Sequence, residues 1–182
     1  MNKKTIVIGG GAAGCFAAIF AAESGSETVI IEPNGRLGKK LSITGKGRCN
    51  ITNDCDRDTF LKNISRNSSF LYGAISRFDT KDCMDFIESL GVPLKTERGN
   101  RVFPVSDKAS DIVNAIGKRA ERLGVKIIRD RAVKIDCSQE ERRVIGVKTE
   151  KGFIPGDKVI LATGGLSYPA TGSTGDGYKM AR

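Results

Sequence analysis

TIVIGGGAAG, residues 5–14, is the stretch that decides the fold of this chain. It predicts a short apolar strand, a glycine turn, and an alanine-rich helix that runs to about Ser24. A second apolar strand, TVII at residues 28–31, follows the helix and ends at Glu32. Strand, glycine turn, helix, strand and acid, in that order, are typical of a dinucleotide-binding unit.

The three spaced glycines have separate physical tasks. Gly9 permits the tight turn, Gly11 lets the main chain approach a pyrophosphate, and Gly14 lets the helix pack closely on the strand. The free N–H groups and the dipole at the helix N-terminus favour a phosphate there. Glu32 comes eighteen residues after Gly14, where a carboxylate can accept hydrogen bonds from a ribose 2′-OH. We therefore predict a dinucleotide site around this unit.

The composition describes a globular chain with one core of ordinary size. Its 182 residues are 39% hydrophobic and 28% charged, and no apolar run approaches the roughly 20 residues of a membrane span. We expect a cytoplasmic protein. The five cysteines form no CxxC pair, so neither a disulfide framework nor a zinc site is predicted. The absence of histidine excludes Ser-His-Asp triads and histidine-ligated metals within these residues.

The formal net charge is +9, and residues 36–66 hold eight Lys and Arg against three Asp. Nucleic-acid surfaces interleave basic residues with stacking aromatics, whereas aromatics are only 6% of this chain and tryptophan is absent. We therefore expect no nucleic-acid partner. Most of the basic side chains are interpreted as a solvated face, from which a phosphate-bearing cofactor would use two or three.

The middle of the chain predicts helices around a short hairpin. Helical patterning covers residues 59–78 in one or two pieces and a further helix capped by Asp79 or Thr80; a hairpin at 94–103 and an amphipathic helix at 109–123 follow. A glycine-rich loop from about residue 36 to residue 58 precedes them and is long for a connector.

From residue 125 onward the hydrophobic pattern changes to strands. We expect them at residues 126–129, 132–136, 143–149, 152–154 and 159–162. Residues 132–154 form an antiparallel meander between two parallel strands. The predicted fold class is α/β, a three-layer FAD/NAD(P)-binding Rossmann-like fold with a β-meander crossover, in one domain over residues 1–182 with a helical insertion at about 57–124.

Four separated motifs carry a family resemblance. ATGG at residues 162–165 follows a buried strand, as in two-dinucleotide-binding-domain flavoproteins. GKKLSITGKGRCNITN at 38–53, RVFPVSDKAS at 101–110 and SYPATGSTGDGY at 167–178 resemble signatures of the BaiN/RdsA (YhiN-like) family of FAD-dependent oxidoreductases. The resemblance covers the whole chain. It implies an FAD-binding fold, and further that the chain is the N-terminal part of a longer protein, incomplete at its C-terminus, without the substrate domain and the returning segment that completes the FAD site.

The resemblance also implies a set of cofactor-binding residues. The FAD diphosphate would meet Gly9, Gly11, Ala13 and Gly14, and the ribose would meet Glu32. Lys40, Arg48, Cys49 and Asn50 would line the diphosphate and flavin side, with Gly45 and Gly47 giving close main-chain approach. Val133 would meet adenine through its main chain, Thr163, Gly164 and Gly165 would close over the cofactor, and Asp176 would approach it from the last helix.

Simpler interpretations of these residues stay open. Lys40 is also compatible with a solvated side chain, Val133 with a core side chain, and Asp176 with a helix cap. Arg48, inside a glycine loop, is more readily explained by an anion or a flavin carbonyl. Lys46 stands where many relatives carry a third glycine, which adds charge and bulk to that loop.

The implied activity is that of a flavoprotein oxidoreductase, in which FAD passes hydride from NAD(P)H to an organic acceptor. For the chain alone, activity stays open and no catalytic residue is assigned. One alternative is a truncated or inactive dinucleotide-binding module without catalysis. Another is a disulfide reductase that uses Cys49 and Cys55, although a buried structural cysteine is the commoner case.

Overall fold

The computed structural model describes residues 3–138 and 140–182. The chain divides into two compact units, each of which is described by itself. The first unit comprises the residues up to Leu41 together with Ile116–Arg182, and the second unit comprises Ser42–Ala115.

A parallel sheet forms the centre of the first unit. Its strand order is β10-β1-β2-β6, with β1 at Lys4–Ile8, β2 at Glu27–Ile31, β6 at Lys126–Ile128 and β10 at Lys158–Leu161. Ile6 lies opposite Val29 on one side and Val159 on the other. The apolar runs of β1 and β2 are buried because the sheet is covered on both faces.

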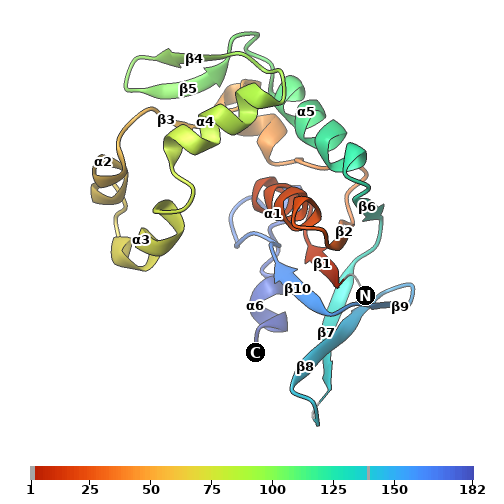
Figure 1. Ribbon diagram of the computed structural model, residues 1–182. Coiled ribbons are helices and arrows are strands. Elements are labelled where there is room, and N and C mark those ends of the chain that lie inside the picture. The colour runs from red at the N-terminus through yellow and green to blue at the C-terminus, as the bar shows by residue number, and fades with distance from the viewer. Residues whose placement is uncertain (1–2, 139) are drawn as a thin grey trace. The chain divides into compact units, whose positions relative to one another are not determined.

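Helix α1, Ala12–Glu23, packs against β1, β2 and β10 (Figure 1). Its small residues allow this close approach, and Cys15, Ala18 and Ile19 are buried. Strand, turn, helix and strand follow one another as the opening sequence predicts, so the predicted dinucleotide-binding unit has the expected fold.

The meander covers the other face of the parallel sheet. Strands β7 (Ala132–Ser138), β8 (Arg143–Thr149) and β9 (Phe153–Pro155) form an antiparallel sheet in the order β7-β8-β9. Ile6, Ile8, Ile31, Ala132 and Val147 form one buried cluster that joins this sheet to the parallel strands. Helix, parallel sheet and meander give the three predicted layers.

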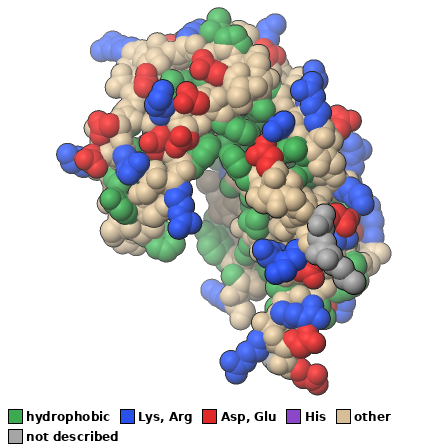
Figure 2. Space-filling view, viewed as in Figure 1, with side chains coloured by type: hydrophobic (Ala, Val, Ile, Leu, Met, Phe, Trp, Pro, Cys, Tyr) green, Lys and Arg blue, Asp and Glu red, His purple; other side chains and the backbone are tan. Residues whose placement is uncertain are grey.

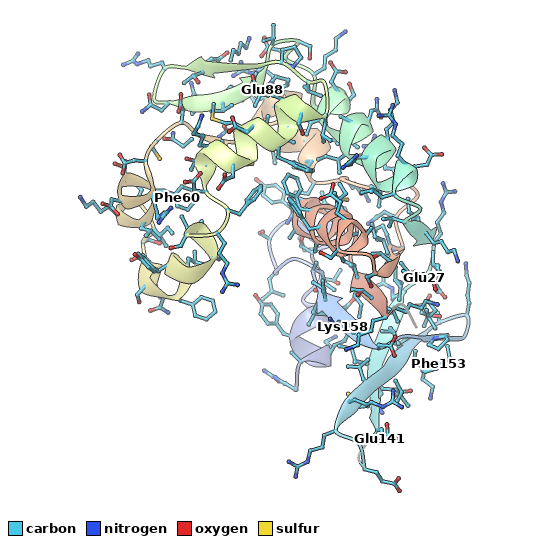
Figure 3. All side chains as sticks on the ribbon, viewed as in Figure 1. Glu27, Phe60, Glu88, Glu141, Phe153 and Lys158 are labelled. Atoms are coloured by element: carbon cyan, nitrogen blue, oxygen red, sulfur yellow. The ribbon has the colours of Figure 1, made fainter. Side chains whose placement is uncertain are left out.

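The amino ends and the carboxyl ends of the parallel strands have different surroundings. Figure 3 labels Glu27 and Lys158 at the amino ends of β2 and β10. The carboxyl ends lead into Gly9, Glu32 and Ala162, and in α/β sheets ligands bind at this edge. After β10 the chain forms a short 3-10 turn, Pro169–Thr171, and helix α6, Asp176–Met180.

The second unit consists of short helices and a small antiparallel sheet. Its sheet has the order β3-β5-β4, with β3 at Thr52–Asn53, β4 at Leu94–Glu97 and β5 at Arg101–Pro104; the helices are α2 (Arg57–Lys62), α3 (Ser68–Ile75) and α4 (Thr80–Ser89). The hairpin and the helices are therefore confirmed. Asp79 caps α4 in a capping box with Asp82.

Two further features complete this description. The 36–58 region is less irregular than expected, because it contains 3-10 turns within Leu41–Gly47, interrupted by a kink at residues 44–46, and strand β3. Helix α5, Ala109–Arg122, begins in the second unit and ends in the first. Over the described residues, we find no helix with the length and apolar character that a membrane span needs.

Candidate dinucleotide site

The glycine turn, Gly9–Gly14, is packed so tightly that two of its glycines are required. Gly9 has a φ of +106°, and a Cβ on it would lie 2.5 Å from the carbonyl oxygen of Ala162. A Cβ on Gly14 would overlap the carbonyl oxygen of Gly9. Both positions hold glycine because the turn contacts β10 on one side and the first turn of α1 on the other.

The N-terminus of α1 faces open space. Gly11 is the N-cap residue and supplies no side-chain hydrogen bond, and a Cβ added to it would meet no atom within 4 Å. Ala12 and Ala13 are exposed. The first N–H groups of a helix have no partner within the helix, so this end offers main-chain donors to a phosphate. The residues present therefore fit a dinucleotide diphosphate.

Glu32 is buried, with 7% of its surface exposed, and its carboxylate binds the glycine turn. One oxygen accepts a hydrogen bond of 2.6 Å from the Gly10 N–H. The other accepts from the Asn34 main-chain N–H at 2.8 Å and from its side-chain Nδ2 at 2.6 Å. A carboxylate accepts about four hydrogen bonds, which leaves room for about one donor from a ribose. The main role of Glu32 within the protein is thus to hold the glycine turn in shape through these hydrogen bonds.

Val133 lies at a bulge in the meander. Ala132 pairs with Thr149 and Lys134 pairs with Lys148, so the ladder shifts register at Val133. A bulge leaves the main-chain groups of the extra residue outside the ladder, which suits the predicted main-chain contact with adenine. The alternative of a core side chain is wrong, because 55% of Val133 is exposed.

The turn after β10 is closely packed by α6. Gly164 has a φ of +76°, and a Cβ on Gly177 of α6 would overlap the hydroxyl of Thr163. Gly165 lies next to Tyr178, whose hydroxyl would be 3.5 Å from a Cβ at that position. These contacts place the ATGG turn beside the last helix, at the carboxyl end of β10.

Asp176 is bound to the meander and does not cap α6. The N-cap residue of α6 is Gly175, so the helix-cap interpretation is wrong. The Asp176 carboxylate lies 2.9 Å from Arg131 Nη1 and also accepts a hydrogen bond of 2.9 Å from the Thr174 hydroxyl. Asp176 therefore links α6 to the start of β7, which is a positioning role.

Lys40 connects the segment after β2 to the segment after β10. Its Nζ donates to the carbonyl oxygen of Ser167 at 2.8 Å and to the Ser173 hydroxyl at 2.6 Å. Ser173 is buried. The interpretation of Lys40 as a merely solvated side chain is wrong, because two of its three N–H donors are bound within the protein.

The other predicted residues belong to the second unit and form the glycine loop, Gly45–Asn50. A Cβ on Gly45 would lie 2.9 Å from Asn50 N and 2.9 Å from the Phe103 ring, whereas one on Gly47 would meet nothing within 4 Å. Lys46 has a φ of +59° and Cys49 a φ of +63°. The left-handed backbone at Lys46 is one that glycine adopts without steric cost.

The side chains of the glycine loop bind within their own unit. Arg48 Nη1 lies 2.9 Å from Glu97 Oε1 and 3.2 Å from Asp107 Oδ1, and Lys95 lies 2.7 Å from Asp107. The guanidinium also stacks on Phe103, 4.0 Å from its ring centroid. In the orientation that satisfies its amide, Asn50 donates to the carbonyl oxygens of Thr52 and Val102 at 3.1 and 3.2 Å.

Arg48, Lys95, Glu97 and Asp107 form an ion-pair quartet. The hydrogen bond from Arg48 lowers the pKa of Glu97, and the hydrogen bond from Lys95 lowers the pKa of Asp107. The same contacts raise the pKa of Arg48, chiefly through Glu97. The two positive and two negative charges of the quartet neutralise one another. Because Arg48 is in the glycine loop and Lys95 and Glu97 are on β4, the quartet holds the loop against the β4–β5 hairpin.

The cysteines considered for disulfide chemistry lack an activated thiol. Cys49 is fully buried, and burial raises its pKa. Burial, followed by the charges of Asp56 and Asp54, raises the pKa of Cys55. Reactive cysteines have lowered pKa values, so neither thiol has the environment of a disulfide reductase.

Sequence reasoning missed several residues that support the site. Asn34, Ser173 and Arg131 hold Glu32, Lys40 and Asp176 in place. In the sequence, Asn34 is 2 residues from Glu32, Ser173 is 133 residues from Lys40, and Arg131 is 45 residues from Asp176. Only the Asn34 contact is local enough for a turn pattern in the sequence to indicate it.

Comparison with known proteins places this geometry in a family. The HI0933-like protein Rossmann domain matches residues 3–182. The chain is 34% identical to the 3-dehydro-bile acid delta(4,6)-reductase of Clostridium scindens, over 100% of this chain and 44% of that protein. It is 31% identical to the ribosomal RNA dihydrouridine synthase of Escherichia coli, over 97% of this chain and 43% of that protein.

A solved structure shows the same fold. The open conformation of a flavocytochrome c3 fumarate reductase superposes with a TM-score of 0.69 at 21% identity, covering 99% of this chain and 40% of that one. The chain thus spans less than half the length of the relatives it matches. The predicted Rossmann-like fold and the predicted resemblance are both confirmed. The chain belongs to the HI0933-like protein Rossmann domain family.

Proposed function

We propose that this chain holds the adenosine diphosphate half of FAD in an enzyme that passes hydride from NAD(P)H to an organic acceptor. The observation that carries the proposal is the open N-terminus of α1, where Gly11 has free space in front of it. Glu32 shapes the turn behind that space. Bound FAD supplies the redox chemistry, while protein groups supply position and electrostatics.

The residues of the chain have distinct roles in this proposal. The main chain at Gly11 to Ala13 binds the diphosphate, and the remaining acceptor capacity of Glu32 binds a ribose hydroxyl. Val133 offers main-chain groups to adenine from its bulge. Thr163, Gly164 and Gly165 form the wall at the end of β10. In the second unit, Gly47 keeps the open space that main-chain approach to a ligand needs.

Relatives support the reductive direction. One is named a bile-acid delta(4,6)-reductase and another a ribosomal RNA dihydrouridine synthase, and both names describe reductions. A reduction needs an electron donor, and we propose a nicotinamide nucleotide because the family resemblance of the sequence implies one. The free cysteines support the proposed cytoplasmic location, because thiols without disulfide partners suit a reducing compartment.

Absorption spectra and stopped-flow reduction test this function. The protein that contains this chain is expected to carry flavin absorption when purified, and NADH or NADPH is expected to bleach it. Retained flavin without bleaching by either nucleotide would favour the binding module without catalysis. Colourless protein that takes up neither FAD nor ADP would rule out both functions.

Ribosomal RNA is a second candidate substrate. The relative that acts on ribosomal RNA removes the ground for excluding nucleic acid. The first unit holds nineteen of the thirty Lys and Arg but eleven of the twenty-one Asp and Glu. Figure 2 shows blue and red side chains mixed on the visible face of the β7–β8 hairpin, without a single basic stripe.

Dihydrouridine content of ribosomal RNA separates the two candidates. If RNA is the substrate, the rRNA of a strain lacking this protein loses a dihydrouridine that the restored gene returns. Unchanged rRNA would leave a small organic acceptor as the proposed substrate.

A further inference from the structure

Tyr168 has a backbone conformation that its residue type disfavours. Its φ is +57° and its ψ is +64°, in the left-handed region. Bulky side chains rarely adopt this region, and Pro169 restricts the preceding residue further. Asn67 and Asn100 share a positive φ, but asparagine tolerates it. Tyr168 therefore carries strain that needs a physical reason.

Packing does not supply that reason. Tyr168 is 68% exposed, so its ring gains little from burial. Lys40 Nζ lies 6.0 Å from the centroid of the ring, at the outer limit of a cation–π interaction. Strain without a gain in burial is typical of residues held in position for a ligand.

The main chain on both sides of Tyr168 is anchored. The carbonyl oxygen of Ser167 accepts a hydrogen bond from Lys40 Nζ at 2.8 Å. The carbonyl oxygen of Tyr168 accepts from the Thr171 N–H at 2.9 Å and from the Thr171 hydroxyl at 2.7 Å. Because Lys40 also binds the buried Ser173, it positions the whole segment and, with it, the exposed ring.

Tyr168 lies at the ligand-binding edge of the first unit. Ser173 Oγ is 2.8 Å from the position of a Cβ on Gly164, in the turn that follows β10. Leu166 and Tyr178 are also exposed and lie around Gly175, since a Cβ there would be 2.5 Å from Leu166 and 3.6 Å from Tyr178. Leu166 and Tyr178 are thus exposed apolar neighbours close to the turn after β10, in the same segment that carries the exposed ring of Tyr168.

We propose that Tyr168 is a stacking platform for a planar conjugated ring and that Lys40 is the positioning residue that holds it. The inference rests on the proposed function and deepens it. The ring belongs either to the flavin of FAD or to a planar organic acceptor, and aromatic stacking on the tyrosine face is the shared chemistry.

Three variants test the platform. Tyr168→Leu removes the ring but keeps apolar bulk, Tyr168→Phe keeps the ring, and Tyr72→Leu removes another exposed tyrosine, on α3 of the second unit. Equilibrium binding is measured with FAD, with lumiflavin as a ring without phosphates, and with ADP as phosphates without the ring. Steady-state KM is measured with menadione as a planar acceptor.

If the flavin is the ring, Tyr168→Leu weakens FAD and lumiflavin binding about tenfold, as expected for the loss of one stacked ring. ADP binding stays within about twofold, and Tyr168→Phe and Tyr72→Leu resemble the wild type. If the acceptor is the ring, FAD binding is unchanged and the KM for menadione rises about tenfold instead.

The proposal is overturned if Tyr168→Leu leaves all ring binding unchanged, or if Tyr168→Phe is as impaired as Tyr168→Leu. A wild type that binds FAD and ADP while Tyr168→Leu changes nothing refutes this inference alone. A wild type that binds no FAD, ADP or lumiflavin refutes the proposed function as well. Tyr168→Gly adds a readout of strain: its Tm is expected to be no lower than that of the wild type, while ring binding is lost.

Discussion

The glycine turn of the first unit and the glycine loop of the second unit are built from the same residue type but use it differently. In the turn, glycine lets a helix and a strand meet closely and leaves the N–H groups of Gly11 to Ala13 facing open space. In the loop, left-handed backbone at Lys46 and Cys49 winds the chain back onto its own unit, where Arg48 and Asn50 bind neighbouring groups.

This difference shows that a glycine-rich motif does not by itself make a ligand-binding site. A ligand needs donors that the protein itself leaves free, and the turn offers them in a row at the start of α1. Arg48, which the sequence favours as an anion ligand, has two carboxylates as partners within its own unit. Four substitutions test the comparison, from the largest expected effect to the smallest.

Gly14→Ala is expected to destabilise the protein most. Its new methyl group would overlap the carbonyl oxygen of Gly9, so main chain must move. We expect a loss of about 3 kcal/mol, or a fall in Tm of about 10 °C, in thermal unfolding. A Tm equal to that of the wild type would show that helix and strand are not closely packed there.

Gly11→Ala is expected to separate binding from stability. The methyl group meets no protein atom but occupies the space in front of α1. We expect a change in Tm within about 3 °C and an affinity for ADP at least about tenfold lower by calorimetry. Unchanged ADP affinity would mean that the diphosphate does not approach α1 at this point.

Arg48→Gln is expected to lower stability without affecting ADP. The folded-state pKa values of Glu97 and Asp107 are lowered by their cationic partners. A lowered pKa contributes stability above the unfolded value of about 4, and this stability is lost as the pH falls through the folded value. The Tm difference from the wild type is therefore expected at neutral pH and should shrink as the pH falls below the unfolded-state pKa of about 4.

Lys81→Gln is the matched control for Arg48→Gln. Lys81 forms an exposed ion pair with Asp85 on α4 of the same unit, 3.8 Å apart. The substitution Lys81→Gln is therefore expected to leave the Tm almost unchanged. If Arg48→Gln instead reduced ADP affinity as much as Gly11→Ala and left the Tm unchanged, Arg48 would be a ligand for the cofactor, as the motif indicates.

Among the four test substitutions, Lys46→Gly is expected to have the smallest effect on stability and the opposite sign. Glycine relieves the left-handed strain at this residue, about 1–2 kcal/mol, and costs about 0.4–1 kcal/mol in unfolded-chain entropy. A small rise in Tm with unchanged ADP affinity is expected. A fall in Tm would show that the Lys46 side chain contributes contacts that outweigh the strain.

The sequence predicts the local elements well because their causes are local. Hydrophobic period, spaced glycines and the Asp79 cap identify the strands, α1 and α4 within a few residues. The side-chain partners are long-range, such as Lys40 with Ser173 or Arg48 with Glu97. A single sequence has no signal for these pairs, so the carboxylate partners of Arg48 cannot be read from it. The sequence also gives no signal for the exposure of Val133, because a bulge changes which face a strand residue occupies.

Amide chemical shifts during titration with ADP test the central claim most directly. If the glycine turn is the site, the N–H signals of Gly11, Ala12 and Ala13 and that of Val133 shift as ADP binds, while those of the glycine loop, Gly45–Asn50, stay in place. Shifts confined to the glycine loop, or no shifts at saturating ADP, would contradict the account.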